Sequence, residues 1–484
     1  MSLSTAFNTA RTSLQTTSTR LSVSATNIAA ADNTSASRKI AVVTTASDGS
    51  TRVVNITRAS DSALFDRMLS STSSSAQLSA INDGLTALHE TVGDTQSESS
   101  PAALLGAFST ALSASANAPD DQALAGAAVS AAQDLAQSLN DATVTVQQVR
   151  ADADTGIATS VAHVNELLTK FQVANDAVVK GTATGADVTG SLDERDAILA
   201  QLSQEMGIST LTRANNDVAI YTDSGVTLFD KSARTVSFSA TPSFDPSTSG
   251  NAVYVDGVAV AGPGASTSMA LKSGAIVGYA TLRDDVAVTY QSQLDAVAEG
   301  LVDAFKETDQ TGGGQPALNG LFTVVTGAST GSGVAGRIMV NAAAIPSEGG
   351  SVFALRDGGM NGAAYVYNTN SEASYATRLS SLVSNLAAPR TYAASTQLQS
   401  DTSLAAFASG SVSWLEGQRS ATSTKLDAQS AVLSQTSTAL SSATGVNLDN
   451  EYALQLELER SYTASSKLIG VVDNLYNQLF SVIG

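Results

Sequence analysis

Cysteine is absent from the 484 residues, and histidine and tryptophan occur only twice and once. Without thiols the chain forms no disulfide, and at this length it can bury two to four hydrophobic cores without one. Two separated histidines and no cysteine also cannot assemble the usual soft ligands of a transition metal. We therefore expect no metal site and no cofactor. A chain free of thiols also suits a protein that crosses compartments unfolded.

Charged residues are scarce as well, at 14% of the sequence, and acids outnumber bases so that the net charge is −19. Binding to nucleic-acid phosphates needs clustered Lys and Arg, so this balance argues against a nucleic-acid partner. No apolar run approaches the roughly 18 residues that span a bilayer, and we expect no membrane insertion. Ser, Thr and Ala dominate instead. A surface of small uncharged side chains can pack closely against copies of itself.

Heptad patterns occupy both ends of the chain. At each end, apolar or small residues recur mostly at alternating steps of three and four, which places them along one seam of a helix. One such helix is common in ordinary cores, whereas one at each terminus predicts two helices that pack against each other and against neighbouring copies. The seam positions are Leu3, Phe7, Ala10, Leu14, Thr17, Leu21, Ser24 and Ile28, and Leu454, Leu458, Ser461, Ser465, Leu468, Val472, Leu475, Leu479 and Val482.

Large apolar side chains of the two seams form the predicted assembly interface. Their burial is worth less than the conformational entropy lost in ordering both backbones, and lone helices are marginal in water. We therefore expect both ends to be largely disordered in the monomer and helical after assembly. Residues 1–31 have the composition of a transit peptide, but the heptads give them a structural role and we expect no cleavage. The interface residues are Leu3, Phe7, Leu14, Leu21, Ile28, Leu454, Leu458, Leu468, Val472, Leu475 and Leu479.

Between the ends, the patterns alternate between helix and strand. Two β-rich runs at 40–45 and 52–57 flank an Asp-Gly pair, which predicts a hairpin, and a long helix is expected over 120–180. Short β-rich runs separated by Gly, Pro, Asn and Ser fill about 208–370, as in antiparallel β domains. Helical patterns return after 371, so both termini are expected at one end of a rod and the β segment farthest from them.

These patterns predict a multidomain α+β fold. Terminal coiled-coil helices extend from a helical rod domain into which an antiparallel β-rich domain is inserted. The predicted domains are a terminal helical domain of 1–34 and 446–484 that forms an inner tube, a mainly helical rod domain of 35–207 and 371–445, and a β-rich outer domain of 208–370.

Catalytic patterns are present but incomplete. Residues 327–331 spell G-x-S-x-G around Ser329, the pattern of a nucleophile elbow, which needs a histidine base later in the chain and a helix directly after the serine. His89 and His163 both precede Ser329, and the residues after it read as loop and strand. We expect no catalytic residues, although an esterase built on Ser329 stays open as a weak alternative.

Three segments resemble the bacterial flagellar rod and hook axial proteins. Asn27-Ile28-Ala29 through Ser37-Arg38 is similar to the N-terminal signature of that family, although Asn33-Thr34-Ser35-Ala36 departs from its usual Thr-Pro-Gly-Tyr. Val446-Asn447-Leu448-Asp449 with Glu451, followed by Tyr462-Thr463-Ala464-Ser465, resembles the C-terminal signature. The internal run Leu192-Asp193-Glu194-Arg195-Asp196 is similar to a segment of the hook-associated junction subunits within the family.

The resemblance implies a structural role in the flagellum. It implies export through the flagellar type III apparatus, a ring of copies at the distal end of the hook in the extracellular flagellum, and attachment of the filament. The implied partners are other copies of the chain, the hook protein, a second hook-associated junction protein, and an export chaperone at the C-terminal helix. Other axial subunits, namely hook protein or flagellin, remain alternatives, as does a secreted adhesive protein with a β recognition domain on a helical stalk.

Overall fold

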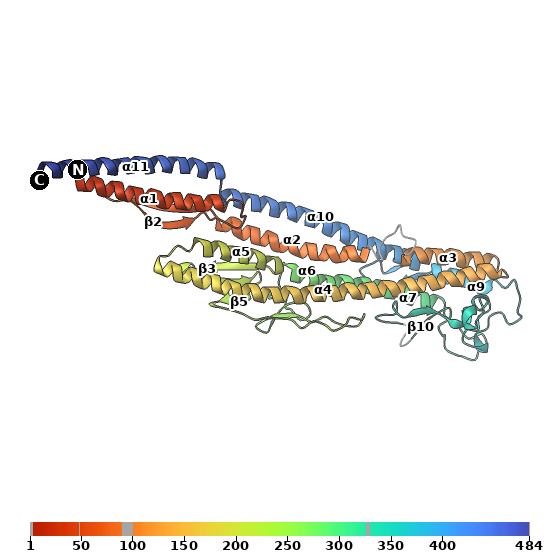
Figure 1. Cartoon of the computed structure of the whole chain (residues 1–484). Coiled ribbons are helices and arrows are strands. Elements are labelled where there is room, and N and C mark those ends of the chain that lie inside the picture. Colours follow the sequence, from red (N-terminus) through yellow and green to blue (C-terminus); the bar gives the residue numbers. More distant parts are fainter. Residues whose placement is uncertain (1–2, 48, 90–99, 326–329, 484) are drawn as a thin grey trace.

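The computed structural model describes residues 3–47, 49–89, 100–325 and 330–483. It is an elongated rod with the two chain ends at the same tip (Figure 1). The prediction that the termini meet at one end is therefore confirmed. Helices dominate, and small antiparallel sheets lie beside them, which confirms the α+β class.

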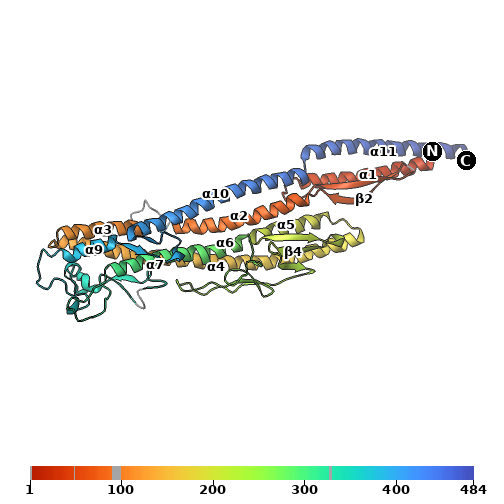
Figure 2. The same ribbon diagram turned by 180° about the vertical axis from the view of Figure 1, so that it is seen from behind.

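The tip of the rod is built from two terminal helices and a hairpin. Helices α1 (Leu3–Ala29) and α11 (Leu448–Ile483) run side by side, and the antiparallel strands β1 (Lys39–Thr45) and β2 (Thr51–Arg58) pack on α1. In both views α1 lies between α11 and the hairpin (Figures 1 and 2). The predicted hairpin is confirmed, with a register shift between Val42 and Val43.

Long helices form the shaft. Helix α4 has 63 residues and spans about 95 Å at ~1.5 Å per residue. It begins where the Asp121 carboxylate accepts hydrogen bonds from the backbone N–H groups of Ala123 and Leu124, and it ends at Gly185, whose φ of 72° is the left-handed conformation that glycine tolerates best. The shaft helices are α2 (Ser62–Leu88), α3 (Pro101–Asn117), α4 (Gln122–Thr184), α5 (Thr189–Glu205) and α10 (Leu404–Thr444).

Two small sheets lie along the C-terminal half of α4. One has the strand order β3-β4-β5-β6 and the other β7-β8-β9, and all pairings are antiparallel. Phe171 of α4 meets Phe229 edge-on, with ring centroids 5.0 Å apart. The strands are β3 (Ile208–Thr212), β4 (Val218–Thr222), β5 (Thr227–Asp230), β6 (Ser232–Ala233), β7 (Val236–Ser237), β8 (Val253–Val255) and β9 (Val258–Ala261).

The chain has two hydrophobic cores. One lies between α4 and the sheets β3–β9, and the other fills the end of the rod away from the termini. Phe108, Phe305 and Phe322 lie together in it with ring centroids 5.3–5.5 Å apart, and all three are fully buried. Apart from short 3-10 helices and the helices α10 and α11 given above, the elements beyond residue 270 are α6 (Ala275–Thr281), the π-helix η3 (Leu282–Val286), α7 (Ala287–Ala304), β10 (Phe322–Val324), β11 (Ile338–Val340), α8 (Ala354–Asp357), α9 (Thr377–Ala387), β12 (Pro389–Thr391) and β13 (Asp401–Ser403).

Two expectations about residues 208–370 need correction. The segment contains helices α6 and α7 as well as strands, because their buried faces complete the cores against α2 and α4. Nor is the β structure farthest from the termini as a whole, since the sheets β3–β9 lie beside the middle of the rod and only β10–β11 lie near its far end (Figure 1). The proposed domain boundaries stay predictions.

Candidate assembly site

Helices α1 and α11 meet along a seam of mostly small and polar residues. Ser13 Oγ lies 3.2 Å from Ser465 Oγ, and Ser24 Oγ donates to the Glu451 carboxylate at 2.8 Å, so the helices are antiparallel. Buried residues recur every seven positions on both helices, which is the repeat of a coiled coil. Small side chains here bring the two backbones close together. The buried set is Ala10, Thr17 and Ser24 on α1, and Glu451, Leu458, Ser465 and Val472 on α11.

The residues of the predicted interface fall into three groups that differ in solvent exposure. Leu458 and Val472 are buried against α1, while Leu3, Phe7, Leu14, Leu21, Ile28 and Leu454 are half-buried. Leu468, Leu475 and Leu479 are 56%, 44% and 51% exposed. The structure therefore does not place all the leucines in the α1–α11 seam, because the row through Glu451 and Leu458 occupies it.

An apolar stripe remains open on α11. Leu468, Val471, Leu475 and Leu479 follow one another at steps of three and four, so they lie on one side of the helix, and each is at least 44% exposed. We call these four residues the outer stripe. In the register set by the two hydrogen bonds, Leu3 lies opposite residues 472–475, and the last residues of α11 extend past the start of α1 (Figure 1). The end of the outer stripe therefore has no neighbour among the described residues of α1.

The hairpin is fastened to α1 on the other side. Thr16 Oγ1 donates to the carbonyl of Thr51 at 2.7 Å, and the Asn27 amide exchanges two hydrogen bonds with the backbone of Lys39, at 2.8 and 2.9 Å. Adjacent residues of α1 are consequently buried on two faces, Thr16 toward the hairpin and Thr17 in the row that follows α11. Helix α1 is thus the middle layer of the tip.

A buried carboxylate joins the terminal pair to the shaft. Glu451 is 1% exposed and accepts from Arg38 Nε at 2.8 Å and from Ser24. The backbone N–H of Arg38 donates to the carbonyl of Thr444, at the end of α10. Burial of a charge is tolerated when it is paired and hydrogen-bonded. Arg38 and Glu451 therefore fix the angle at which α1, α10 and α11 meet.

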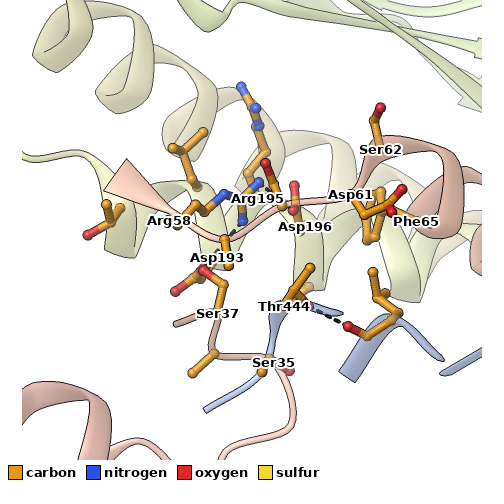
Figure 3. A pocket seen from close by; sticks show the side chains of 18 of the residues that line it. Ser35, Ser37, Arg58, Asp61, Ser62, Phe65, Asp193, Arg195, Asp196 and Thr444 are labelled. Atoms are coloured by element: carbon orange, nitrogen blue, oxygen red, sulfur yellow. Dashed lines mark hydrogen bonds and ion pairs between the residues drawn. The ribbon is translucent and has the colours of Figure 1, made fainter. Parts of the chain in front are cut away.

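A second ionic cluster ties the hairpin to α5. Arg58 donates to Asp193 at 3.1 Å and to Asp196 at 2.6 Å, and Ser37 Oγ donates to Asp193 at 2.5 Å (Figure 3). Burial raises the pKa of Asp196, and the Arg58 guanidinium opposes this shift. The cluster lines a groove of about 1430 Å³ between the hairpin, α5 and the end of α10.

Buried Arg195, on the same turn of α5, binds two neighbouring elements. Its guanidinium donates to Asn175 on α4 and to the carbonyl of Asn216, and burial lowers its pKa. The Asn175 carbonyl oxygen also accepts from the backbone N–H of Val218, at the start of β4. The charged run on α5 therefore holds three neighbouring elements together, and its Asp193 and Asp196 face the hairpin.

The three segments that resemble flagellar axial proteins converge at this point. Arg38 belongs to the first, Asp193 and Asp196 to the internal run, and Glu451 to the last, although more than 400 residues separate the outer two. The sequence identified these residues only as members of separate motifs and did not predict that they lie close together. The one sequence feature that could have singled them out is their charge, because the sequence around them is rich in Ser and Ala.

Ser329 lies outside the described residues. Among those described, no group of three or more His, Asp or Glu side chains could hold a metal ion. His89 faces Glu416, and His163 Nδ1 lies 2.8 Å from Glu205. No described helix is long and apolar enough to cross a membrane.

The chain is a rod whose two ends pair at one tip, where apolar side chains of α11 remain exposed. This architecture is typical of a subunit of a larger assembly. Residues 85–320 match the family model described as the helical domain of the flagellar hook-associated protein FlgK. The match confirms the resemblance to the hook-associated proteins for this part of the chain. Proteins of that family are structural components of the flagellum.

One solved structure is similar in part. The flagellar hook junction protein FlgK from Burkholderia pseudomallei is 21% identical, with a TM-score of 0.44, and the match covers 54% of this chain and 46% of that chain. The match therefore spans less than half of that protein. No curated protein matches the chain.

Proposed function

We propose that the chain is a structural subunit, not an enzyme, of the junction between the flagellar hook and filament. The hook-associated helical domain at 85–320 carries this proposal. The paired ends support it, because Arg38 and Glu451 couple the terminal helices to the shaft while Leu468 and Leu475 stay open for neighbours. Copies would travel unfolded through the flagellar export apparatus and join as a ring outside the cell.

The proposed partners follow from the same assignment. They are further copies of the chain, the hook protein, a second hook-associated junction protein, and an export chaperone that binds the C-terminal helix. The exposed apolar side of α11 supports the last, since a chaperone would shield it before assembly.

The decisive test is deletion of the gene. Cells lacking the chain should build hooks but no attached filaments, and flagellin should be shed into the medium, as judged by electron microscopy and immunoblotting. Normal filaments on the deletion strain would contradict the proposal.

A point variant separates export from assembly. Leu468→Asp places a charge on the outer stripe, and burying that charge unpaired in a contact would cost several kcal/mol, on the order of 2–5. The variant should be exported yet fail to attach filaments. Val173→Asp is the matched control, because Val173 is 69% exposed on the shaft, and it should support normal motility.

A further inference from the structure

The loop between β7 and β8 extends from one hydrophobic core of the molecule to the other. It leaves and rejoins the sheets β3–β9, and in both views this part of the chain extends along α4 toward the far end of the rod (Figures 1 and 2). Its middle reaches the far end, because a Cβ atom placed on Gly333 would lie 3.2 Å from Pro246. Val334 and Ala335, which follow Gly333, are fully buried there. We call residues 238–252 the strap, the core against the sheets the sheet core, and the other the far core.

A turn of π-helix lies where the two cores meet. The π-helix η3 joins α6 to α7 without a break, with Ile276 of α6 in the sheet core and Tyr290 of α7 in the far core. Arg283, within η3, is fully buried, and its backbone carbonyl accepts a hydrogen bond from Arg150 Nε at 3.0 Å. Single π turns inside helices are frequent at functional sites. The boundary between the cores therefore holds two buried arginines in contact with each other.

Three buried side chains fasten the strap to the shaft at this boundary. Arg150 and Asp154 of α4 and Arg283 of η3 are each at most 2% exposed, and each binds backbone groups of the strap. The bonds run from Arg150 to the carbonyls of Asp245 and Thr248 at 3.0 and 2.6 Å, from the Thr241 N–H to Asp154 at 2.7 Å, and from Arg283 to the carbonyl of Asn251 at 2.7 Å. The strap is thus held at intervals of three or four residues.

The two arginines differ in how far they depend on the strap. Arg283 forms ion pairs with Asp154 and Asp284, at 2.5 and 2.7 Å. Arg150 binds four acceptors, and two of them are strap carbonyls. Its guanidinium also lies 4.8 Å from the ring centre of Phe244 in the strap, a favourable cation–π contact. A buried charge is stable only when it has such partners, so Arg150 is the residue most dependent on the strap.

We propose that the strap couples the two cores so that they unfold as one unit. This inference goes beyond the proposed function and does not depend on it. If the sheet core opened alone, the strap would leave with its sheet, and Arg150 would stay buried without two of its acceptors, which is costly. The continuity of α4 does not prevent separate opening, because regions of one chain can unfold locally with different free energies. The strap supplies the missing connection.

Urea unfolding of the full-length chain tests the coupling when both cores are observed in one sample. Trp414, the only tryptophan, packs against the far core, so its fluorescence reports unfolding there. Pulsed hydrogen exchange with mass spectrometry reports β4 in the sheet core and α7 in the far core. The unsubstituted chain should lose all three signals at one urea concentration. Separate midpoints for β4 and α7 in this chain would overturn the inference.

Arg150→Gln removes the side chain that depends most on the strap. We expect the midpoints of β4 and α7 to separate by about 1 M urea, the order of shift that follows from loss of a buried charged partner. Arg195→Gln is the matched control, because Arg195 is 5% exposed and binds Asn175 and the carbonyl of Asn216 beside the sheet core. It should lower the common midpoint without dividing it. Coincident midpoints in Arg150→Gln would overturn the inference.

A second variant changes only the strap and keeps the test decisive if Arg150→Gln does not fold. The double substitution Phe244→Ser and Pro246→Gly removes the ring beside Arg150 and the contact with Gly333, and both side chains are only half-buried. The two midpoints should separate by a smaller amount, about 0.3 M urea. Coincident midpoints in this folded double variant would equally overturn the coupling.

Discussion

The far end of the rod and its tip bury different kinds of side chain. The far end buries the aromatic rings of Phe108, Phe305 and Phe322 completely, around helices that belong to one chain. The tip buries mostly small residues and one carboxylate, with Leu458 and Val472, while Leu468 and Leu475 stay exposed. From this contrast we expect the far end to be stable within one chain and the tip to gain stability from neighbouring copies.

The largest expected effect tests the independence of the far end. Phe108→Ala should destabilise the monomer by about 3–5 kcal/mol, because it empties a fully packed aromatic site. Leu475→Ala should change the stability of the monomer by less than about 0.5 kcal/mol, since this side chain is exposed. Denaturant unfolding of both variants measures the contrast, and equal losses would remove the distinction between the two regions.

Hydrogen exchange gives the second test. In the monomer, amides of α1 and α11 should exchange much faster than those of α4, because few large side chains are buried at the tip. Protection of α1 and α11 should then rise on assembly. Equal protection of all three helices in the monomer would contradict the expectation that the ends order only in the assembled state.

A substitution at the buried carboxylate tests the joint between tip and shaft. Glu451→Gln keeps the shape but leaves Arg38 without its charged partner, and we expect a loss of about 2–3 kcal/mol in assembly free energy, below the 3–5 of a fully buried pair. Arg38 is 38% exposed, so water compensates part of the loss. Sedimentation measures the change. Glu457→Gln, at an exposed position of the same helix, should have little effect.

The smallest effect concerns the fastening of the hairpin to α5. Asp193→Asn weakens the bonds from Arg58 and Ser37, and we expect a loss of about 1–2 kcal/mol in local stability, the range for a partly buried charged acceptor. Hydrogen exchange of β1 and β2 reports this loss. Glu194→Gln, the exposed neighbour, is the control, and equal exchange in the two variants would show that the cluster does not hold the hairpin.

Local patterns predicted the elements whose signals are local. The Asp-Gly turn located the hairpin, the heptads located α1 and α11, and strands β4, β5, β8 and β9 follow the predicted β-rich runs. Helices α6 and α7 were missed, because their short apolar stretches suit strands equally well and only packing on α2 and α4 decides between the two.

The site was harder to predict than the fold. A seven-residue repeat fits more than one row of a helix, so it cannot tell that the row of Leu458 faces α1 while the row of Leu468 faces outward. The meeting of Arg38, Asp193 and Glu451 depends on how distant helices are positioned. No spacing in the sequence encodes that arrangement.

Helix α4 gives the molecule a mechanical property. It contributes residues to both hydrophobic cores without interruption, with Leu135 and Val146 in one and Leu167 and Phe171 in the other. One core can turn against the other only if this helix bends or twists. A torque applied at the far end would therefore be transmitted through α4 to α5, and from α5 to the hairpin through the bond between Arg58 and Asp193. The two cores would rotate together along the length of the chain.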